Sequence, residues 1–194
     1  MRFLFVGGGT GGHLTPAIGL AEGLEARGHE TLFLLSGRDV EQSYVADGRA
    51  CISLAFESSR FPRPIALIGA ARRARKQAQK FRPDAVIALG GAASAASLAI
   101  PHAPLVLLEG NFVIGRSVKW MASFSALILT MFEPTAKQLK RAIAMGPVTR
   151  KVLQKQDADT ARKQFDLDPK RKTLLIMGGS QGAKDLNDLE QSLL

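Results

Sequence analysis

The stretch FVGGGTGGHLTPAIGLAEGL, residues 5–24, decides the fold class of this 194-residue chain. An apolar run enters a cluster of glycines and is followed by apolar residues at helical spacing. Gly7, Gly9 and Gly12 have the spacing of a dinucleotide-binding turn, in which bare backbone allows a tight turn and the close approach of a phosphate. The stretch therefore predicts a strand, a glycine loop and a helix, which form the first unit of an α/β fold.

The rest of the chain continues this alternation of short apolar runs and amphipathic segments. The first helix is expected over residues 16–28, with Pro16 in its first turn. Strands are expected at 2–6, 30–36, 50–56, 84–91, 104–110, 125–130 and at the start of 172–183. Further helices are expected at 39–46, 64–81, 92–100, 115–122, 134–143, 158–167 and from 184 onward. Apolar strands alternating with helices predict an α/β fold, a Rossmann-like, doubly wound parallel sheet covered on both faces.

The composition restricts the class of protein further. The net charge is +9, from 26 basic and 17 acidic residues, which indicates a polyanionic partner such as nucleic acid, anionic lipid or a phosphorylated substrate. The only cysteine, Cys51, excludes an intramolecular disulfide and is expected to be buried. No signal-peptide pattern is found at the N-terminus, and no apolar run approaches the roughly 20 residues that span a bilayer. We expect a protein that is soluble or rests on a membrane surface.

Glycine-rich loops follow three of the expected strands, at residues 7–13, 89–94 and 177–187. Because ligands of parallel α/β sheets bind beyond the carboxyl ends of the strands, these loops are candidate anion sites. Together they suggest two phosphorylated ligands in one cleft. His13 lies where the first helix begins, so it can bind a phosphate or accept a proton near neutral pH, or else cap and pack the helix.

The first loop alone leaves an oxidoreductase possible. An NAD site requires an acidic residue about 20 positions further on, and the sequence there is LLSGRD. Ser36 and Arg38 suit the 2′-phosphate of NADP instead. An NADP-dependent oxidoreductase is therefore an alternative, although it explains neither His13 nor the third loop.

The motifs GGGTGGHLTPA, LGG followed by a serine, LEGN and GGSQGAKDLN occur in this order along the chain. They resemble the MurG family of GT-B glycosyltransferases, and the resemblance runs from residue 1 to 194. It implies transfer of N-acetylglucosamine from UDP-GlcNAc to a lipid-linked muramyl-pentapeptide diphosphate in peptidoglycan biosynthesis, with inversion and without a metal or other cofactor. It also implies an acceptor-binding Rossmann-like domain at 1–146, a linker at 147–157, and at 158–194 the start of an incomplete donor domain of similar fold.

The resemblance also implies roles for individual residues. His13 would be the catalytic base, and Glu109 is a second candidate for that role. The acceptor-binding residues would be Thr10, Gly11, Gly12, Gly90, Gly91, Ser94 and Asn111. The donor-binding residues would be Gly179, Ser180, Gln181, Gly182 and Asn187.

The chain departs from the family pattern in several positions. Leu108 and Gly110 replace a histidine and a glutamine, and Val118 replaces an asparagine. Ala92 and Ala93 replace an aromatic residue and a valine. These changes remove groups that could orient a substrate, so the identity of the acceptor stays open. The family continues beyond the position of Leu194, so we expect further sequence or a partner chain to complete the donor domain. A non-catalytic, membrane-binding subunit is a third hypothesis.

A basic segment follows the third expected strand. Eight basic residues and no acidic one lie between Glu57 and Asp84. The predicted membrane patch comprises Phe61, Ile65, Leu67, Ile68, Arg72, Arg73, Arg75 and Lys76. Apolar residues beside a cationic helix suit an anionic bilayer, where each cation near the surface contributes about 1 kcal/mol. With the family resemblance, this predicts peripheral binding at the cytoplasmic face of the bacterial inner membrane. A solvated helix face is the alternative, and nucleic acid is disfavoured because one Trp and one Tyr offer few stacking surfaces.

Overall fold

The computed structural model describes residues 1–9, 11–38, 41, 48–56, 63–150, 156–178, 186 and 188. The chain divides into two compact units, Met1–Lys151 and Val152–Leu194, which we describe separately.

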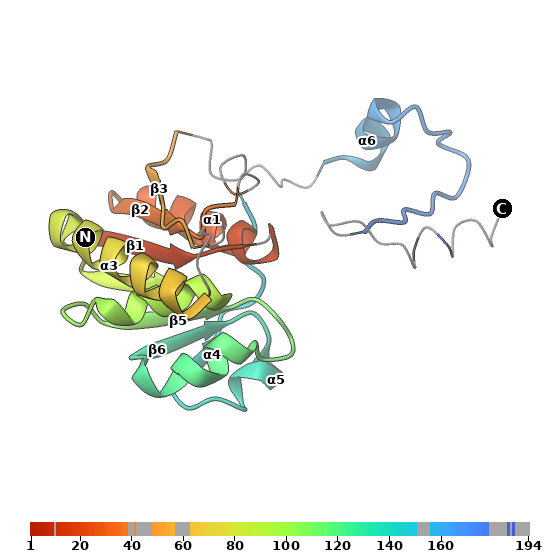
Figure 1. Cartoon of the computed structure of the whole chain (residues 1–194). Coiled ribbons are helices and arrows are strands. Elements are labelled where there is room, and N and C mark those ends of the chain that lie inside the picture. Colours follow the sequence, from red (N-terminus) through yellow and green to blue (C-terminus); the bar gives the residue numbers. More distant parts are fainter. Residues whose placement is uncertain are drawn as a thin grey trace. The chain divides into compact units, whose positions relative to one another are not determined.

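The first unit contains a seven-stranded, parallel sheet of order β3-β2-β1-β4-β5-β6-β7 (Figure 1). The strands are β1 (Arg2–Gly7), β2 (Glu30–Leu35), β3 (Cys51–Ser53), β4 (Ala85–Ala88), β5 (Leu105–Glu109), β6 (Leu127–Thr130) and β7 (Ala142–Ala144). The direction of strand addition reverses between β1 and β4, so the crevice for a ligand is expected at the carboxyl ends of these two strands. The predicted Rossmann-like, doubly wound sheet is confirmed.

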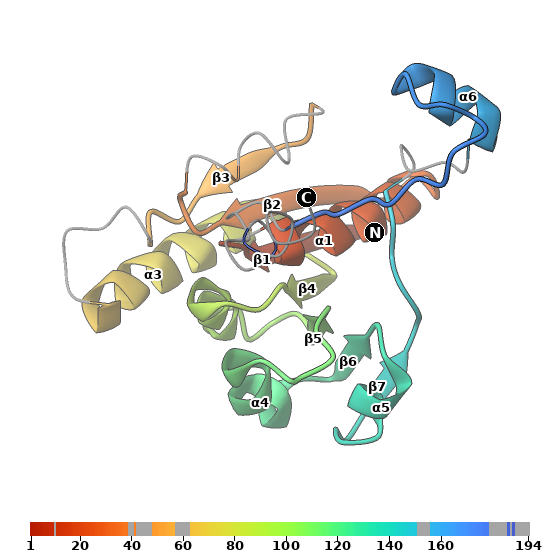
Figure 2. The same ribbon diagram turned by 90° about the vertical axis from the view of Figure 1, so that its right-hand side faces the viewer.

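Helices cover both faces of this sheet (Figure 2). One face packs against α1 (Gly11–Glu25), whose Leu14 and Ile18 contact the stacked rings of Phe5 and Phe33. The other face packs against α3 (Arg63–Phe81), the 3-10 helix η1 (Ala92–Ala99) and α4 (Arg116–Met121). Every fourth residue of α3 facing the sheet is a buried alanine, at 66, 70, 74 and 78, which lets this helix approach the sheet closely while its charged residues face outward. Two short elements, η2 (Ala122–Phe124) and α5 (Glu133–Ala136), flank β6.

The first helix begins earlier than the sequence predicted. It starts at Gly11 rather than at residue 16, because Leu14 is fully buried against the sheet and the glycine loop itself forms the first turn. Pro16 therefore lies inside α1 and is buried. Since proline has no amide hydrogen, it cannot donate to the carbonyl of Gly12, which an ordinary residue at this position would do.

The prediction of a helix over 134–143 was wrong in its second half. The helix α5 ends at Ala136, and Ala142–Ala144 forms β7, which pairs with β6. Arg141 adopts a positive φ of 59°, and its carbonyl accepts from the amide of Ile128. Pairing at the edge of the sheet thus outweighed the local helical pattern.

Two further expectations concern the edge next to β2. Cys51 is exposed rather than buried, because it lies on the short edge strand β3, whose first and last residues face outward. The helix expected at 39–46 lies outside the described residues except for Glu41, which is helical and fully buried.

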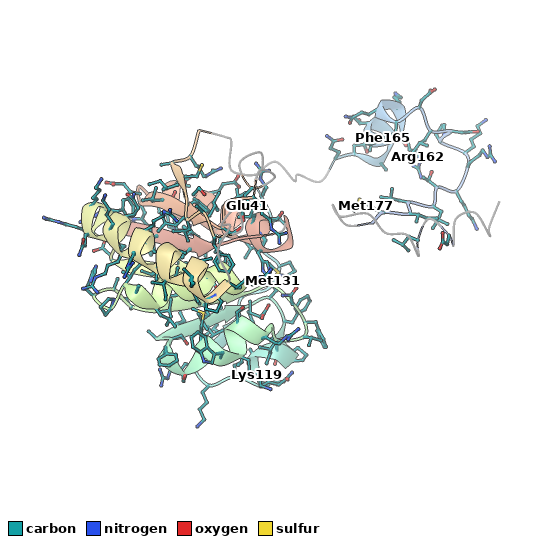
Figure 3. All side chains as sticks on the ribbon, viewed as in Figure 1. Glu41, Lys119, Met131, Arg162, Phe165 and Met177 are labelled. Carbon is teal, nitrogen blue, oxygen red and sulfur yellow. The ribbon has the colours of Figure 1, made fainter. Side chains whose placement is uncertain are left out.

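In the second unit the described residues contain the helix α6 (Ala158–Gln164). Asp157 caps it by accepting from the amides of Asp159 and Thr160 at 3.2 and 3.1 Å. Residues 172–178 form no strand, contrary to the prediction, since the described part of this unit contains no other strand with which they could pair. Phe165 and Met177, labelled in Figure 3, are exposed by 70% and 77%.

Candidate functional site

The first two glycine loops contact each other at the carboxyl ends of β1 and β4. A Cβ atom on Gly7, whose φ is +126°, would lie 2.9 Å from the carbonyl oxygen of Gly90. A Cβ atom on Gly91, whose φ is +72°, would lie 2.8 Å from the carbonyl oxygen of Gly8. Both distances are too short for any side chain, so these positions require glycine and the two backbones form one continuous surface.

The imidazole of His13 lies over the second loop. His13 is the third residue of α1 and is half-buried. A Cβ atom on Gly90 would lie 3.0 Å from Cε1 and 3.1 Å from Nδ1 of the ring. Burial lowers the pKa of His13 below its ordinary value of 6.5, while the charge of Glu109 and a backbone hydrogen bond with Leu89 oppose this shift. The imidazole is therefore neutral at pH 7 and can accept a proton.

An open groove of about 690 Å³ begins beside this imidazole. Predicted site residues on its wall are His13, Gly90, Gly91, Glu109 and Asn111. The same groove is lined by Leu67 and Arg63 of α3 and by Trp120 and Arg116 of α4. The groove therefore joins His13 and the second glycine loop to α3 and α4.

Glu109 is buried at the end of β5 and is engaged by its own loop. Its Oε1 accepts from the backbone amide and the side-chain amide of Asn111 at 2.9 and 2.8 Å. Its Oε2 accepts from the amide of Gly115, the N-cap residue of α4, at 2.7 Å. The carboxylate thus holds the loop from 110 to 115 in place and supplies negative charge near His13. This geometry favours a positioning role for Glu109 over the role of base.

The other predicted acceptor residues differ in what they can offer. Gly11 and Gly12 form the first turn of α1, where amide groups have no acceptor within the helix. Ser94 is buried, and its hydroxyl donates to the carbonyl of Gly91 at 2.7 Å and lies 3.6 Å from the sulfur of Met121. We therefore interpret Ser94 as part of the support of the second loop. Thr10 lies outside the described residues.

Sequence reasoning missed Glu41, which is labelled in Figure 3. Its carboxylate accepts from the hydroxyl of Ser36 at 2.6 Å and from the amide of Gly9 at 2.5 Å. The guanidinium of Arg38 donates to the carbonyl of Gly9 at 2.9 Å. The two side chains that suggested NADP thus make contacts within the protein. The acidic residue at position 41, two residues beyond LLSGRD, was the available signal, but an acidic residue after the second strand was considered only as a partner for ribose.

The predicted membrane patch lies on the outer face of α3. Ile65 and Ile68 are exposed by 52% and 54%, and Leu67 is half-buried on the wall of the groove. The four cations of the patch on this helix are exposed, and Arg73 also donates to the carbonyl of Leu54. These cations are Arg72, Arg73, Arg75 and Lys76. Phe61 lies outside the described residues.

Two exposed aromatic residues beyond α3 were also missed. Trp120 and Phe124 are exposed by 57% and 61%, with ring centroids 6.0 Å apart. Their spacing of four residues, typical of neighbours on one helical face, was the available signal.

The predicted donor residues Gly179, Ser180, Gln181, Gly182 and Asn187 lie outside the described residues. In the described part of the chain, no three His, Cys, Asp or Glu side chains gather as a possible metal site. No helix among the described residues has the length and apolar character needed to cross a bilayer.

Comparison with known proteins identifies the family. Residues 3–130 match the model of the glycosyltransferase family 28 N-terminal domain. The chain is 34% identical over 215 aligned residues to UDP-N-acetylglucosamine–N-acetylmuramyl-(pentapeptide) pyrophosphoryl-undecaprenol N-acetylglucosamine transferase of Lactobacillus johnsonii, covering 100% of this chain and 58% of the relative. It is 35% identical to the transferase of the same name from Limosilactobacillus reuteri, covering 96% of this chain and 55% of the relative. The chain thus spans little more than half the length of these curated relatives.

Solved structures show the same fold. MurG of Acinetobacter baumannii superimposes with a TM-score of 0.68 at 20% identity, covering 81% of this chain and 47% of that chain. UDP-GlcNAc 2-epimerase of Neisseria meningitidis, bound to UDP-GlcNAc, gives 0.62 at 15% identity over 75% of this chain and 46% of that chain. The resemblance that the motifs indicated is confirmed.

Proposed function

The chain belongs to glycosyltransferase family 28, and from this membership we propose that it provides the acceptor-binding part of a UDP-GlcNAc transferase of peptidoglycan biosynthesis. The acceptor is a lipid-linked muramyl-pentapeptide diphosphate, as the names of the curated relatives suggest. The observation that carries the proposal is the position of His13, a neutral imidazole beside two glycine loops that contact each other, at a groove that continues to the outer face of α3.

The glycine loops support a diphosphate in this position. The amide groups in the first turn of α1, which have no acceptor within the helix, and the positive end of its dipole attract an anion. Gly90 and Gly91 present further backbone without side chains on the same groove. We place the diphosphate of the acceptor against these groups, which leaves its sugar near the imidazole of His13.

The proposed reaction is a single displacement at the anomeric carbon of the donor sugar. His13 accepts the proton of the acceptor hydroxyl while the hydroxyl oxygen forms the new glycosidic bond. The bond to UDP breaks at the same time, and UDP leaves with the electron pair, so the anomeric configuration inverts. Glu109 favours the imidazolium that forms, since its negative charge raises the pKa of His13. In this proposal, amide groups rather than a metal stabilise the leaving diphosphate.

We propose that residues 1–146 form the acceptor-binding domain, that residues 147–157 form a linker, and that the donor domain begins at residues 158–194. Gly179, Ser180, Gln181, Gly182 and Asn187 would contact the UDP moiety. Because the curated relatives are longer than this chain, the transfer is proposed for a protein with a complete donor domain, whether further sequence or a partner chain supplies it.

The outer face of α3 is proposed to bind an anionic membrane surface at the cytoplasmic face of the inner membrane. Exposed Ile65 and Ile68 lie beside four exposed cations, and Trp120 adds an aromatic residue of the kind that prefers the bilayer interface. Leu67 and Trp120 also line the groove that leads to His13. A lipid-linked substrate could thus reach the imidazole while its lipid remains in the bilayer.

Thermal denaturation of the chain with each of two ligands tests the proposal. A short-chain, water-soluble analogue of the lipid-linked acceptor should raise the melting temperature, because binding to the folded state alone stabilises it. NADPH should have no effect. Stabilisation by NADPH without stabilisation by the acceptor analogue would instead support the oxidoreductase and contradict the transferase.

A further inference from the structure

The carboxylate of Glu41 is fully buried and accepts four hydrogen bonds. Its Oε1 accepts from the hydroxyl of Ser36 and the amide of Gly9, and its Oε2 accepts from the amides of Gly37 and Arg38 at 2.8 and 3.0 Å. Two donors on each oxygen satisfy the hydrogen-bonding capacity of a carboxylate in this geometry. Bonds to an ionised acceptor are also stronger than those between neutral groups.

Three of these donors are neighbours of Glu41 in sequence, but Gly9 is 32 residues away. The Gly9 contact therefore joins the end of β2 to the first glycine loop. The carbonyl of Gly9 is also held, since it accepts from the guanidinium of Arg38 at 2.9 Å. At Gly8 a Cβ atom would lie 2.5 Å from Oε1 of Glu41, so the loop closes directly over the carboxylate. Both polar groups of the Gly9 backbone are thus bound to the segment after β2.

The amides of the first glycine loop and of the first turn of α1 therefore differ in what they can bind. The amide of Gly9 is bound inside the protein and is not available to a ligand. The amides of Gly11, Gly12 and His13, in the first turn of α1, have no acceptor within the helix. Because Gly9 is separated from the helix by a single residue, its fixed position determines where these amides point. Glu41 does not line the groove beside His13, so it acts on a ligand only through the loop.

We propose that Glu41 is a positioning residue that fixes the first glycine loop and thereby presets the first-turn amides of α1 for a diphosphate. This inference rests on the proposed function for its ligand. If Glu41 acted only through its charge, removing that charge would strengthen anion binding, because a buried negative charge near an anion site repels the anion. The proposal predicts the opposite change in anion affinity. Loss of positioning should weaken it.

The test compares Glu41→Gln with Ser36→Ala in the full chain. A glutamine places an amide group against two donors, so it cannot keep all four hydrogen bonds, whereas Ser36→Ala removes one donor and leaves Gly9 bound. Calorimetry measures the affinity for inorganic pyrophosphate, and NMR measures hydrogen exchange at the amide of Gly9. In Glu41→Gln we expect pyrophosphate to bind about tenfold more weakly, the equivalent of one charge-assisted hydrogen bond, and the Gly9 amide to exchange faster. Ser36→Ala should stay close to wild type in both measurements.

Glu41→Asp provides a second variant if the glutamine variant does not fold. It keeps the charge, but it is one methylene shorter and cannot reach both Gly9 and the amides after β2, so pyrophosphate binding should again weaken. Unchanged or tighter binding by a folded Glu41 variant would overturn the proposal. Absence of pyrophosphate binding by the wild-type chain would contradict the diphosphate site itself. Unchanged hydrogen exchange at the Gly9 amide in Glu41→Gln would contradict the anchoring by Glu41, and with it this proposal, but would leave the diphosphate site intact.

Discussion

Replacing Gly90 by alanine is expected to displace the imidazole of His13 without removing any functional group. The added Cβ atom would lie 3.0 Å from Cε1 and 3.1 Å from Nδ1 of the ring. Carbon atoms in contact ordinarily lie about 3.5–4.0 Å apart, so the ring must move by about 0.5–1 Å. An alanine at φ +85° also costs about 1–2 kcal/mol of stability. A displacement of about 1 Å at a reacting group can reduce a rate about a hundredfold.

The displacement can be measured by NMR titration of the imidazole in the isolated chain. Moving the ring away from its buried position should raise the pKa of His13 toward the ordinary value of 6.5, because burial is the main cause of its depression. Gly28→Ala is the matched control, since Gly28 has a similar φ of +77° but open space around the added Cβ atom. The control should lose similar stability and leave the titration of His13 unchanged. A Gly90→Ala protein in which His13 titrates as in wild type would refute the proposed contact.

Three further predictions concern the same unit. The free energy of unfolding should fall on acidification through about pH 6.5, because His13, whose pKa is lowered in the folded chain, takes up a proton more readily in the unfolded chain. Chemical denaturation should show a weaker decline in His13→Asn, and an equal decline in both proteins would contradict the role of His13. Reversing the charges of Arg72, Arg75 and Lys76 should weaken sedimentation with anionic vesicles, while reversal of Lys163 in the second unit should not; equal losses would indicate a general charge effect. Transfer by a protein with a complete donor domain should persist in EDTA, and loss of activity restored by a divalent cation would refute a metal-independent reaction.

The sequence itself was sufficient to predict the parallel sheet and the position of the first two glycine loops. Continuous apolar strands alternating with helices allow few other arrangements, and glycine clusters directly after strands have a strong local cause in the tight turn. The position of His13 in the first helical turn was also predictable, because it follows from the loop that precedes it. These features depend on residues that are close together in the chain.

Features that depend on distant residues were decided only by the tertiary structure. The strand β7 forms because the edge of β6 accepts Ala142–Ala144, which nothing in the local pattern indicated. Ser94 had the residue type of a ligand-binding group, but it is buried, and its hydroxyl lies 3.6 Å from the sulfur of Met121, 27 residues away. Glu41 received no role from sequence reasoning because its bond to Gly9 spans 32 residues. A buried polar group must find partners wherever the fold places them, and their identity is a property of the packed chain.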